Sequence, residues 1–221
     1  MLSKVLLNIY KDPFLNRNLG FKGGTCAMFF YGLDRLSVDL DFDLLNNLDT
    51  KQRQKLIDQL GSILKQFGKI TDFADKQNTI LFEIKYQDYA RRLKVEISKR
   101  KLPASYQIKN FLGENIPIMK EEDLFAHKLL ALLNRKWVAN RDIYDIRFFL
   151  QKGIKPNPQI IKKLSGKDLK EYLQQVKKFI ENYDFNKILY GLGELLEPSK
   201  KHFAKTKMKS QILGFLDFYL Q

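Results

Sequence analysis

The sequence has very few of the residues that build disulfide frameworks and soft-metal sites. Its 221 residues include one cysteine, Cys26, and two histidines, His127 and His202. One cysteine excludes an intrachain disulfide framework and a cysteine-rich zinc site, and it is compatible with a reducing cytoplasm. Two histidines also argue against a histidine-rich metal centre. We expect Cys26 to be a small buried residue rather than a nucleophile.

Long hydrophobic runs are absent as well. No apolar stretch reaches the about 20 residues that a membrane-spanning helix needs. The apolar run within residues 1–16 is too short for a secretory signal, and no small-residue cleavage pattern follows it. We therefore expect a soluble, cytoplasmic protein without a membrane partner.

What the chain does have is positive charge and enough apolar material to fold. Hydrophobic residues make up 44% and aromatic residues 13%, which suits one large domain or two small ones. The formal net charge is +14, of which residues 1–100 carry +5 and residues 101–221 carry +9. Excess positive charge attracts polyanions, so nucleic acid and nucleotides are the first partners to test. Many basic proteins, however, carry charge for solubility alone.

The first half of the chain predicts a small mixed α/β sheet. We expect helices at 4–10 and 50–67, strands at 19–22, 37–43, 79–86 and 92–98, and a helix that Thr25 caps and Gly32 ends. From Glu121 onward the apolar period is helical, over 121–135, 141–151, 167–183, 185–196 and 207–219. Prolines at 103 and 117 interrupt the chain between the two patterns. The predicted fold is α+β, with a sheet domain at 1–118 and a basic helical bundle at 119–221.

Acidic residues alternate along one predicted strand. Leu40 and Phe42 would face one side of the sheet, and Ser37, Asp39, Asp41 and Asp43 the other. Strand 92–98 repeats this pattern and would add Glu96 to the acidic face if the two strands are neighbours. Crowded carboxylates repel unless a cation sits among them, and hard Mg²⁺ prefers carboxylate oxygens. Because Asp is disfavoured in strands, a metal site explains the pattern better than a merely polar surface does.

The turn Gly23-Gly24-Thr25 is the natural complement of this acidic face. Glycines let the backbone approach a ligand, and the start of the following helix offers free N–H groups to a phosphate. Such a turn alone is more often an ordinary turn. A phosphate site ahead of a metal site is, however, the arrangement that nucleotidyl transfer needs.

Four further features leave two interpretations open. Lys128 is either a cation for phosphate or a lysine of a half-buried helix, and Asp142 and Asp145 with Arg141 are either part of a site or ordinary helix ion pairs. Trp137, with Arg135 and Lys136, either stacks on a base or packs in a hinge. The lysine cluster within 200–209 either follows an RNA backbone or is a solvated linker before the last helix.

Taken together these motifs resemble the AbiEii/AbiGii-type, MenT-like nucleotidyltransferase toxins, a branch of the polymerase-β-like superfamily. The matching residues run from about 20 to 150: Lys22-Gly23-Gly24-Thr25, Arg35-x-Ser37-x-Asp39-Leu40-Asp41, Lys94-x-Glu96, the Lys128 helix and Arg141-Asp142-x-Tyr144-Asp145. The resemblance implies transfer of a nucleoside monophosphate from an NTP with Mg²⁺ or Mn²⁺. In characterised members the acceptor is the tRNA 3′ end, which halts translation, and a cognate antitoxin is implied.

The resemblance also implies roles for single residues. Gly23, Gly24, Thr25, Arg35, Ser37 and Arg141 would bind the nucleotide. Asp39, Asp41 and Glu96 would bind the metal, Lys128 would contact the phosphates, and Asp142 or Asp145 would close the site. Two other functions remain: a nucleotidyltransferase that modifies a small molecule or a protein hydroxyl, and a non-catalytic module that binds RNA or a partner.

Overall fold

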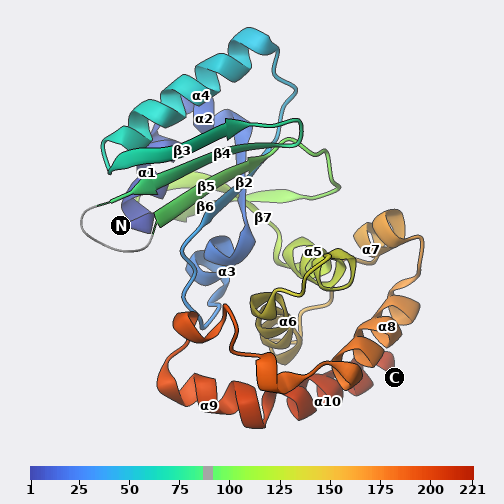
Figure 1. Cartoon of the computed structure of the whole chain (residues 1–221). Helices are drawn as coiled ribbons and strands as arrows, with labels where there is room; N and C mark the ends of the chain where they lie inside the picture. The colour runs from blue at the N-terminus through green and yellow to red at the C-terminus, as the bar shows by residue number, and fades with distance from the viewer. Residues whose placement is uncertain (87–91) are drawn as a thin grey trace. The chain divides into compact units, whose positions relative to one another are not determined.

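The computed structural model describes residues 1–86 and 92–221, and it divides into two compact units. The sheet unit comprises Met1–Phe30 and Ser37–Lys120, and the helical unit comprises Tyr31–Leu36 and Glu121–Gln221. The chain therefore leaves the sheet unit after Phe30, returns at Ser37 and leaves again after Lys120. In Figure 1 the blue-to-green part of the chain forms the sheet unit, except for Tyr31–Leu36, and the yellow-to-red part forms the rest of the helical unit.

The sheet unit contains a seven-stranded mixed sheet with the order β3-β4-β5-β2-β1-β7-β6. Its strands are β1 (Leu19–Lys22), β2 (Leu40–Leu44), β3 (Lys69–Asp75), β4 (Thr79–Lys85), β5 (Arg92–Ser98), β6 (Tyr106–Phe111) and β7 (Glu114–Met119). Its helices are α1 (Leu2–Lys11), α2 (Pro13–Asn18), α3 (Gly23–Tyr31) and α4 (Thr50–Lys65). The pairs β2–β5 and β1–β7 are parallel, and the other neighbours are antiparallel. The predicted α+β class with a mixed sheet is confirmed.

One face of this sheet is apolar and lies under helices. Leu40, Phe42, Val95 and Ile97 are fully buried, and the ring of Tyr10 on α1 lies 6.1 Å from that of Phe42. Helices α1, α2 and α4 pack together on the sheet unit, as the blue and cyan ribbons of Figure 1 show. Since side chains alternate along a strand, the residues between these apolar positions point to the opposite face.

Several elements of the sheet unit differ from the sequence prediction. Strand β2 begins at Leu40 instead of Ser37, so Asp39 precedes the strand. Helix α3 begins at Gly23, so Thr25 lies within its first turn and is not its cap. The prediction also missed α2, β3, β6 and β7. Pro117 was interpreted as a chain break, but it lies in β7 opposite Ile108 of the edge strand β6.

The helical unit is built from α5 (Glu121–Asn134), α6 (Asn140–Gln151), α7 (Pro158–Ser165), α8 (Leu169–Asn182), α9 (Pro198–Thr206) and α10 (Met208–Leu220). The predicted helix over 185–196 is wrong, because only the 3₁₀ turns η1 (Phe185–Lys187) and η2 (Gly193–Leu195) form there. Gly191, with a φ of +65°, interrupts that stretch. Of the two interpretations of the lysine cluster within 200–209, the linker is wrong, because this stretch forms the main part of α9 and the start of α10. In the part of the chain that the structure describes, no helix has the length and apolarity of a membrane span.

Candidate functional site

Two of the predicted carboxylates lie side by side on the sheet. In the parallel pair β2–β5, Asp41 is the direct register partner of Glu96, and both side chains are partly exposed on the face opposite the apolar core. Parallel register partners point to the same side, so their carboxylates share one local surface. The Nζ of Lys94 lies 3.4 Å from Glu96 Oε2, in an ion pair that remains open to water. The predicted neighbourhood of the two strands is confirmed.

Asp43, the next acidic residue on the same face, has a structural role. Its carboxylate accepts hydrogen bonds from Lys22 Nζ at 2.6 Å and from the Tyr106 hydroxyl at 2.5 Å. Burial, followed by the charge of Asp43, raises the pKa of the Tyr106 hydroxyl well above its ordinary value. Asp43 therefore fastens the edge strand β6 to β2.

The glycine turn lies directly against Asp41. Gly23 has a φ of +79° and joins β1 to the first turn of α3. A Cβ at this position would come within 2.9 Å of the Asp41 Cβ and Cγ atoms, and closer still to one carboxylate oxygen. The absent side chain thus leaves the room that the Asp41 carboxylate occupies. The first N–H groups of α3, which have no hydrogen-bond acceptor within the helix, lie at the same place.

The hydroxyl of Thr25 holds the start of the acidic segment in place. Thr25 is fully buried, and its hydroxyl donates to the Asp39 carbonyl and lies 3.0 Å from Ser37 Oγ. These two contacts connect the first turn of α3 to Ser37 and Asp39, which lie just before β2. The Thr25 side chain therefore positions the backbone of Asp39.

Replacing Gly23 by Ala should destabilise the protein more than replacing Gly32 by Ala does. Both glycines have a φ near +80°, which costs a residue with a Cβ about 1–2 kcal/mol. A Cβ at Gly32 meets nothing within 4 Å, whereas one at Gly23 must displace Asp41. Urea unfolding of the two variants measures the difference. Equal free energies of unfolding would show that Asp41 is not confined by the turn.

The carboxylates suit a divalent metal as a pair rather than as a trio. Within residues 1–86 and 92–221, no three His, Cys, Asp or Glu side chains are grouped so as to hold a metal ion. Asp41 and Glu96 are neighbours, while Asp39 lies outside the strand. Mg²⁺ commonly takes one or two protein carboxylates and completes its octahedron with water and substrate phosphates. The residues present fit that mode of binding.

The predicted site residues of the second half form a buried ionic cluster in the helical unit. Arg35 donates to both oxygens of Asp145, from Nε at 2.6 Å and from Nη2 at 2.8 Å, and both side chains are almost fully buried. Lys128 on α5 lies 2.8 Å from Asp145 and 2.7 Å from Asp142, both on α6. Arg135 Nη1 is 3.0 Å from the other oxygen of Asp142. Three cations thus surround two carboxylates.

The titration of this cluster follows from its geometry. Burial by itself would raise the pKa of Asp145, but Lys128 and Arg35 outweigh burial, so the pKa lies below its ordinary value. For Lys128, burial alone would lower the pKa, and the charges of Asp145 and Asp142 raise it instead. Asp145, Lys128 and Arg35 are therefore all charged at neutral pH.

The cluster anchors the segment Tyr31–Leu36, which joins α3 to β2. Besides the contacts of Arg35, the Leu36 N–H donates to the Leu195 carbonyl, and Asp34 faces Arg147 and Lys200. Sequence reasoning missed the pairing of Arg35 with Asp145, which are 110 positions apart. A signal was present in the sequence, because Asp142 and Asp145 alternate with Ile143, Tyr144 and Ile146 in a largely apolar stretch. Arg141, in contrast, is exposed.

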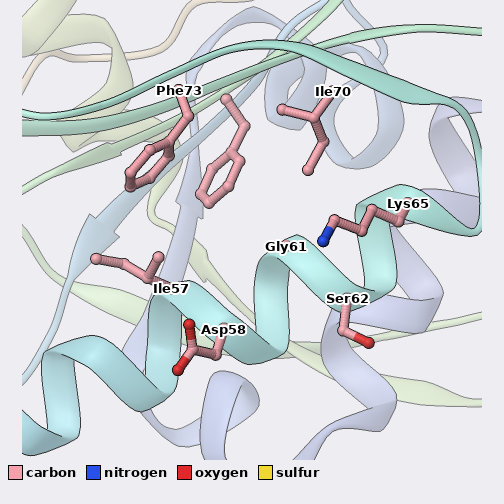
Figure 2. Close-up of a pocket in the computed structure, with 8 residues that line it drawn as sticks. Ile57, Asp58, Gly61, Ser62, Lys65, Ile70 and Phe73 are labelled. Atoms are coloured by element: carbon pink, nitrogen blue, oxygen red, sulfur yellow. The ribbon is translucent and has the colours of Figure 1, made fainter.

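A separate groove of about 390 Å³ lies in the sheet unit between α4 and strands β3 and β4. Figure 2 shows Ile57 and Gly61 of α4 opposite Ile70 and Phe73 of β3. Lys65 and Asp58 lie at the same helix surface. None of the predicted site residues lines this groove, and nothing in its composition indicates nucleotide chemistry.

The geometry can be compared with known proteins. A family model described as "Nucleotidyl transferase AbiEii toxin, Type IV TA system" matches residues 4–214. The solved structure of JHP933 from Helicobacter pylori is 20% identical with a TM-score of 0.58, covering 98% of this chain and 92% of that chain. A second H. pylori structure, of a candidate nucleotidyltransferase, is also 20% identical with a TM-score of 0.59, covering 98% and 95%. These two structures have a similar fold. The comparison with curated proteins gives no significant match.

Proposed function

We propose that the chain, which belongs to the AbiEii nucleotidyltransferase toxin family of type IV toxin–antitoxin systems, transfers a nucleoside monophosphate from an NTP to an RNA acceptor such as the tRNA 3′ end. The family gives the enzyme class, the NTP substrate and an antitoxin as the genetic partner. The RNA acceptor and the metal are the parts that we propose.

One observation carries the proposal. The Asp41 and Glu96 carboxylates lie side by side on β2 and β5, and the Asp41 carboxylate fills the space left by Gly23 at the start of α3. Acidic oxygens and free helix N–H groups thus occur at one place. The first attract a divalent cation and the second attract phosphate. A complex of an NTP with a divalent cation carries both the cation for the carboxylates and the phosphates for the N–H groups.

We assign the following roles to residues of the sheet unit. Asp41 and Glu96 would hold Mg²⁺ or Mn²⁺, whereas Asp39, which the sequence also predicts as a ligand, lies outside β2 and is not part of this pair. When bound, the cation neutralises phosphate charge and makes pyrophosphate a better leaving group. The backbone N–H groups of Gly24 and Thr25 orient the triphosphate, and the Thr25 hydroxyl keeps Asp39 in position through its carbonyl.

The proposed reaction is a displacement at the α-phosphorus of the NTP. A 3′ hydroxyl oxygen of the acceptor forms a bond to that phosphorus, and the bond to the bridging oxygen of the β-phosphate breaks. Pyrophosphate leaves with the electron pair of the broken bond, and the hydroxyl proton is released to solvent. The acceptor thereby gains one nucleoside monophosphate.

The roles of the helical-unit residues in nucleotide binding stay predictions. Lys128, Asp142 and Asp145 are mutually paired in the ionic cluster, so their charges already stabilise the helical unit. Arg35 is likewise paired with Asp145. Residues 101–221 carry a net charge of +9, which supports a polyanionic acceptor.

An acceptor assay tests the function. The full chain is incubated with an α-labelled NTP, Mg²⁺ and either intact tRNA, tRNA with a periodate-oxidised 3′ end, or RNA-free small molecules and proteins. We expect label on intact tRNA, and none on oxidised tRNA because oxidation destroys the attacking hydroxyl. Label found only in the RNA-free fractions would show that the acceptor is a small molecule or a protein instead of RNA. No label on any acceptor, with RNA binding intact, would overturn the enzymatic proposal.

A further inference from the structure

The turn between α5 and α6 presents a large aromatic side chain to solvent. Trp137 is the only tryptophan of the chain, and 77% of its surface is exposed. Lys136 Nζ lies 5.7 Å from the centre of its ring. Tryptophan is mostly buried in folded proteins, so an exposed one beside a cation indicates a binding surface.

A second exposed aromatic is held at the same place by Asn140. The buried Asn140 amide donates to the Lys187 carbonyl at 2.8 Å and to the Tyr190 carbonyl at 2.9 Å. The Tyr183 hydroxyl donates to the Asn140 side-chain oxygen. Tyr190, whose backbone is thereby fixed at the start of α6, is 72% exposed. Since Trp137 precedes Asn140 by only three residues, the backbone positions of the two exposed aromatics are close together.

The charge around these aromatics is positive. The stretches 134–141 and 183–190 together contain four cations, Arg135, Lys136, Arg141 and Lys187, and one acidic residue, Asp184. Lys187 pairs loosely with Asp184 at 3.5 Å, and all four cations are exposed. We call this combination of Trp137, Tyr190 and the four cations the aromatic surface. Aromatic rings for bases, flanked by cations for phosphates, are the pattern that binds single-stranded nucleic acid.

We propose that the aromatic surface binds unpaired nucleotides of the RNA acceptor, with Trp137 and Tyr190 stacking on bases. This inference rests on the proposed function for the identity of the ligand. An apolar peptide fits less well because the two rings lie among cations, and an acidic peptide would pair with the cations but offers no bases to stack on the rings. Stacking of one base on one aromatic corresponds to about 5- to 150-fold in affinity.

The single tryptophan gives a direct test of contact. An unlabelled single-stranded RNA of about twelve nucleotides is titrated into the full chain at low salt, with tryptophan emission recorded and binding followed separately by anisotropy of a labelled copy. We expect emission to be quenched in step with binding, and the blunt duplex of the same sequence to quench much less. Unchanged emission at saturating RNA would overturn the proposal.

Variants separate this inference from the proposed function. Trp137→Ala should raise the Kd for single-stranded RNA about tenfold, and Trp137→Phe should restore most of the affinity. Phe218→Ala is the matched control, because Phe218 is a 74% exposed aromatic of the same unit in a stretch, 214–221, that contains no Lys or Arg. In transfer assays, Trp137→Ala should raise the KM for RNA and leave the KM for NTP unchanged.

The outcomes are distinguishable. If Trp137→Ala transfers label to RNA with the same KM for RNA as the wild type, the proposed role of the aromatic surface is overturned and the proposed function stands. RNA binding that depends on Trp137 in a protein that transfers no label supports the aromatic surface while the proposed function fails. Because Trp137 is exposed, unchanged melting of Trp137→Ala is expected and excludes misfolding as the cause.

Discussion

Asp41→Asn is expected to reduce the rate of nucleotidyl transfer by about 10³-fold, the loss typical of removing one central electrostatic group. The substitution keeps the shape of the side chain next to Gly23 but removes the charge that faces Glu96. A neutral amide is a poor ligand for Mg²⁺ compared with a carboxylate.

Asp72→Asn serves as the control for Asp41→Asn. Asp72 is an exposed aspartate on β3 of the same sheet, so the substitution removes the same charge away from the acidic pair. The rate of label transfer and the urea midpoint are measured for both variants. If Asp41→Asn kept more than a tenth of the wild-type rate, Asp41 would not hold the catalytic metal.

Asp145→Asn is expected to lower the free energy of unfolding by about 3–5 kcal/mol, the usual cost of breaking a buried ion pair. Asp145 has no exposed surface and accepts from both Arg35 and Lys128. Its loss leaves three cations, Arg35, Lys128 and Arg135, with one carboxylate, Asp142. Denaturant unfolding of the full chain measures the effect.

The control for Asp145→Asn is Asp184→Asn, which breaks an exposed ion pair with Lys187. Exposed ion pairs contribute little to stability, so a small loss is expected. Arg35→Met combined with Asp145→Asn should cost less than the sum of the single changes, because the second change removes an unpaired charge. Strict additivity would contradict the pairing of Arg35 with Asp145.

The stability difference between wild type and Asp145→Asn should also depend on pH. The folded protein holds the pKa of Asp145 below its ordinary value of 3.8. A lowered carboxyl pKa contributes stability that is complete above the ordinary pKa and is lost as the pH falls through the lowered one. The difference should therefore be constant near neutral pH and shrink only in strong acid.

The sequence predicted best those elements whose signals are local. Strand β1 ends at Lys22 as expected, because Gly23 adopts a positive φ that no strand continues through. The common face of Asp41 and Glu96 follows from simple alternation, and the register confirms it. Asp39 lies before β2, where its carbonyl accepts a hydrogen bond from the Thr25 hydroxyl, so the alternation rule does not apply to it.

The features that the sequence did not predict depend on distant partners. Nothing near Arg35 indicates that its guanidinium meets a carboxylate on α6. Strands β6 and β7 carry Pro117 and a mostly exposed edge, so they lack the alternation that identified β5. Ion pairs at Asp142 and Asp145 were one of two interpretations, with Arg141 as the expected partner. The structure shows Arg35, Lys128 and Arg135 as partners, and the complete burial of both carboxylates came only with the fold.

The central claim is that the acidic pair of the sheet serves transfer of a nucleoside monophosphate. The most direct measurement compares two labels in one reaction with wild-type protein, Mg²⁺ and tRNA, an NTP labelled at the α-phosphate and the same NTP labelled at the γ-phosphate. The account predicts that the α-label joins the tRNA and the γ-label leaves as pyrophosphate, with both products absent from Asp41→Asn. Appearance of the γ-label on the tRNA, or full α-label transfer by Asp41→Asn, would contradict it.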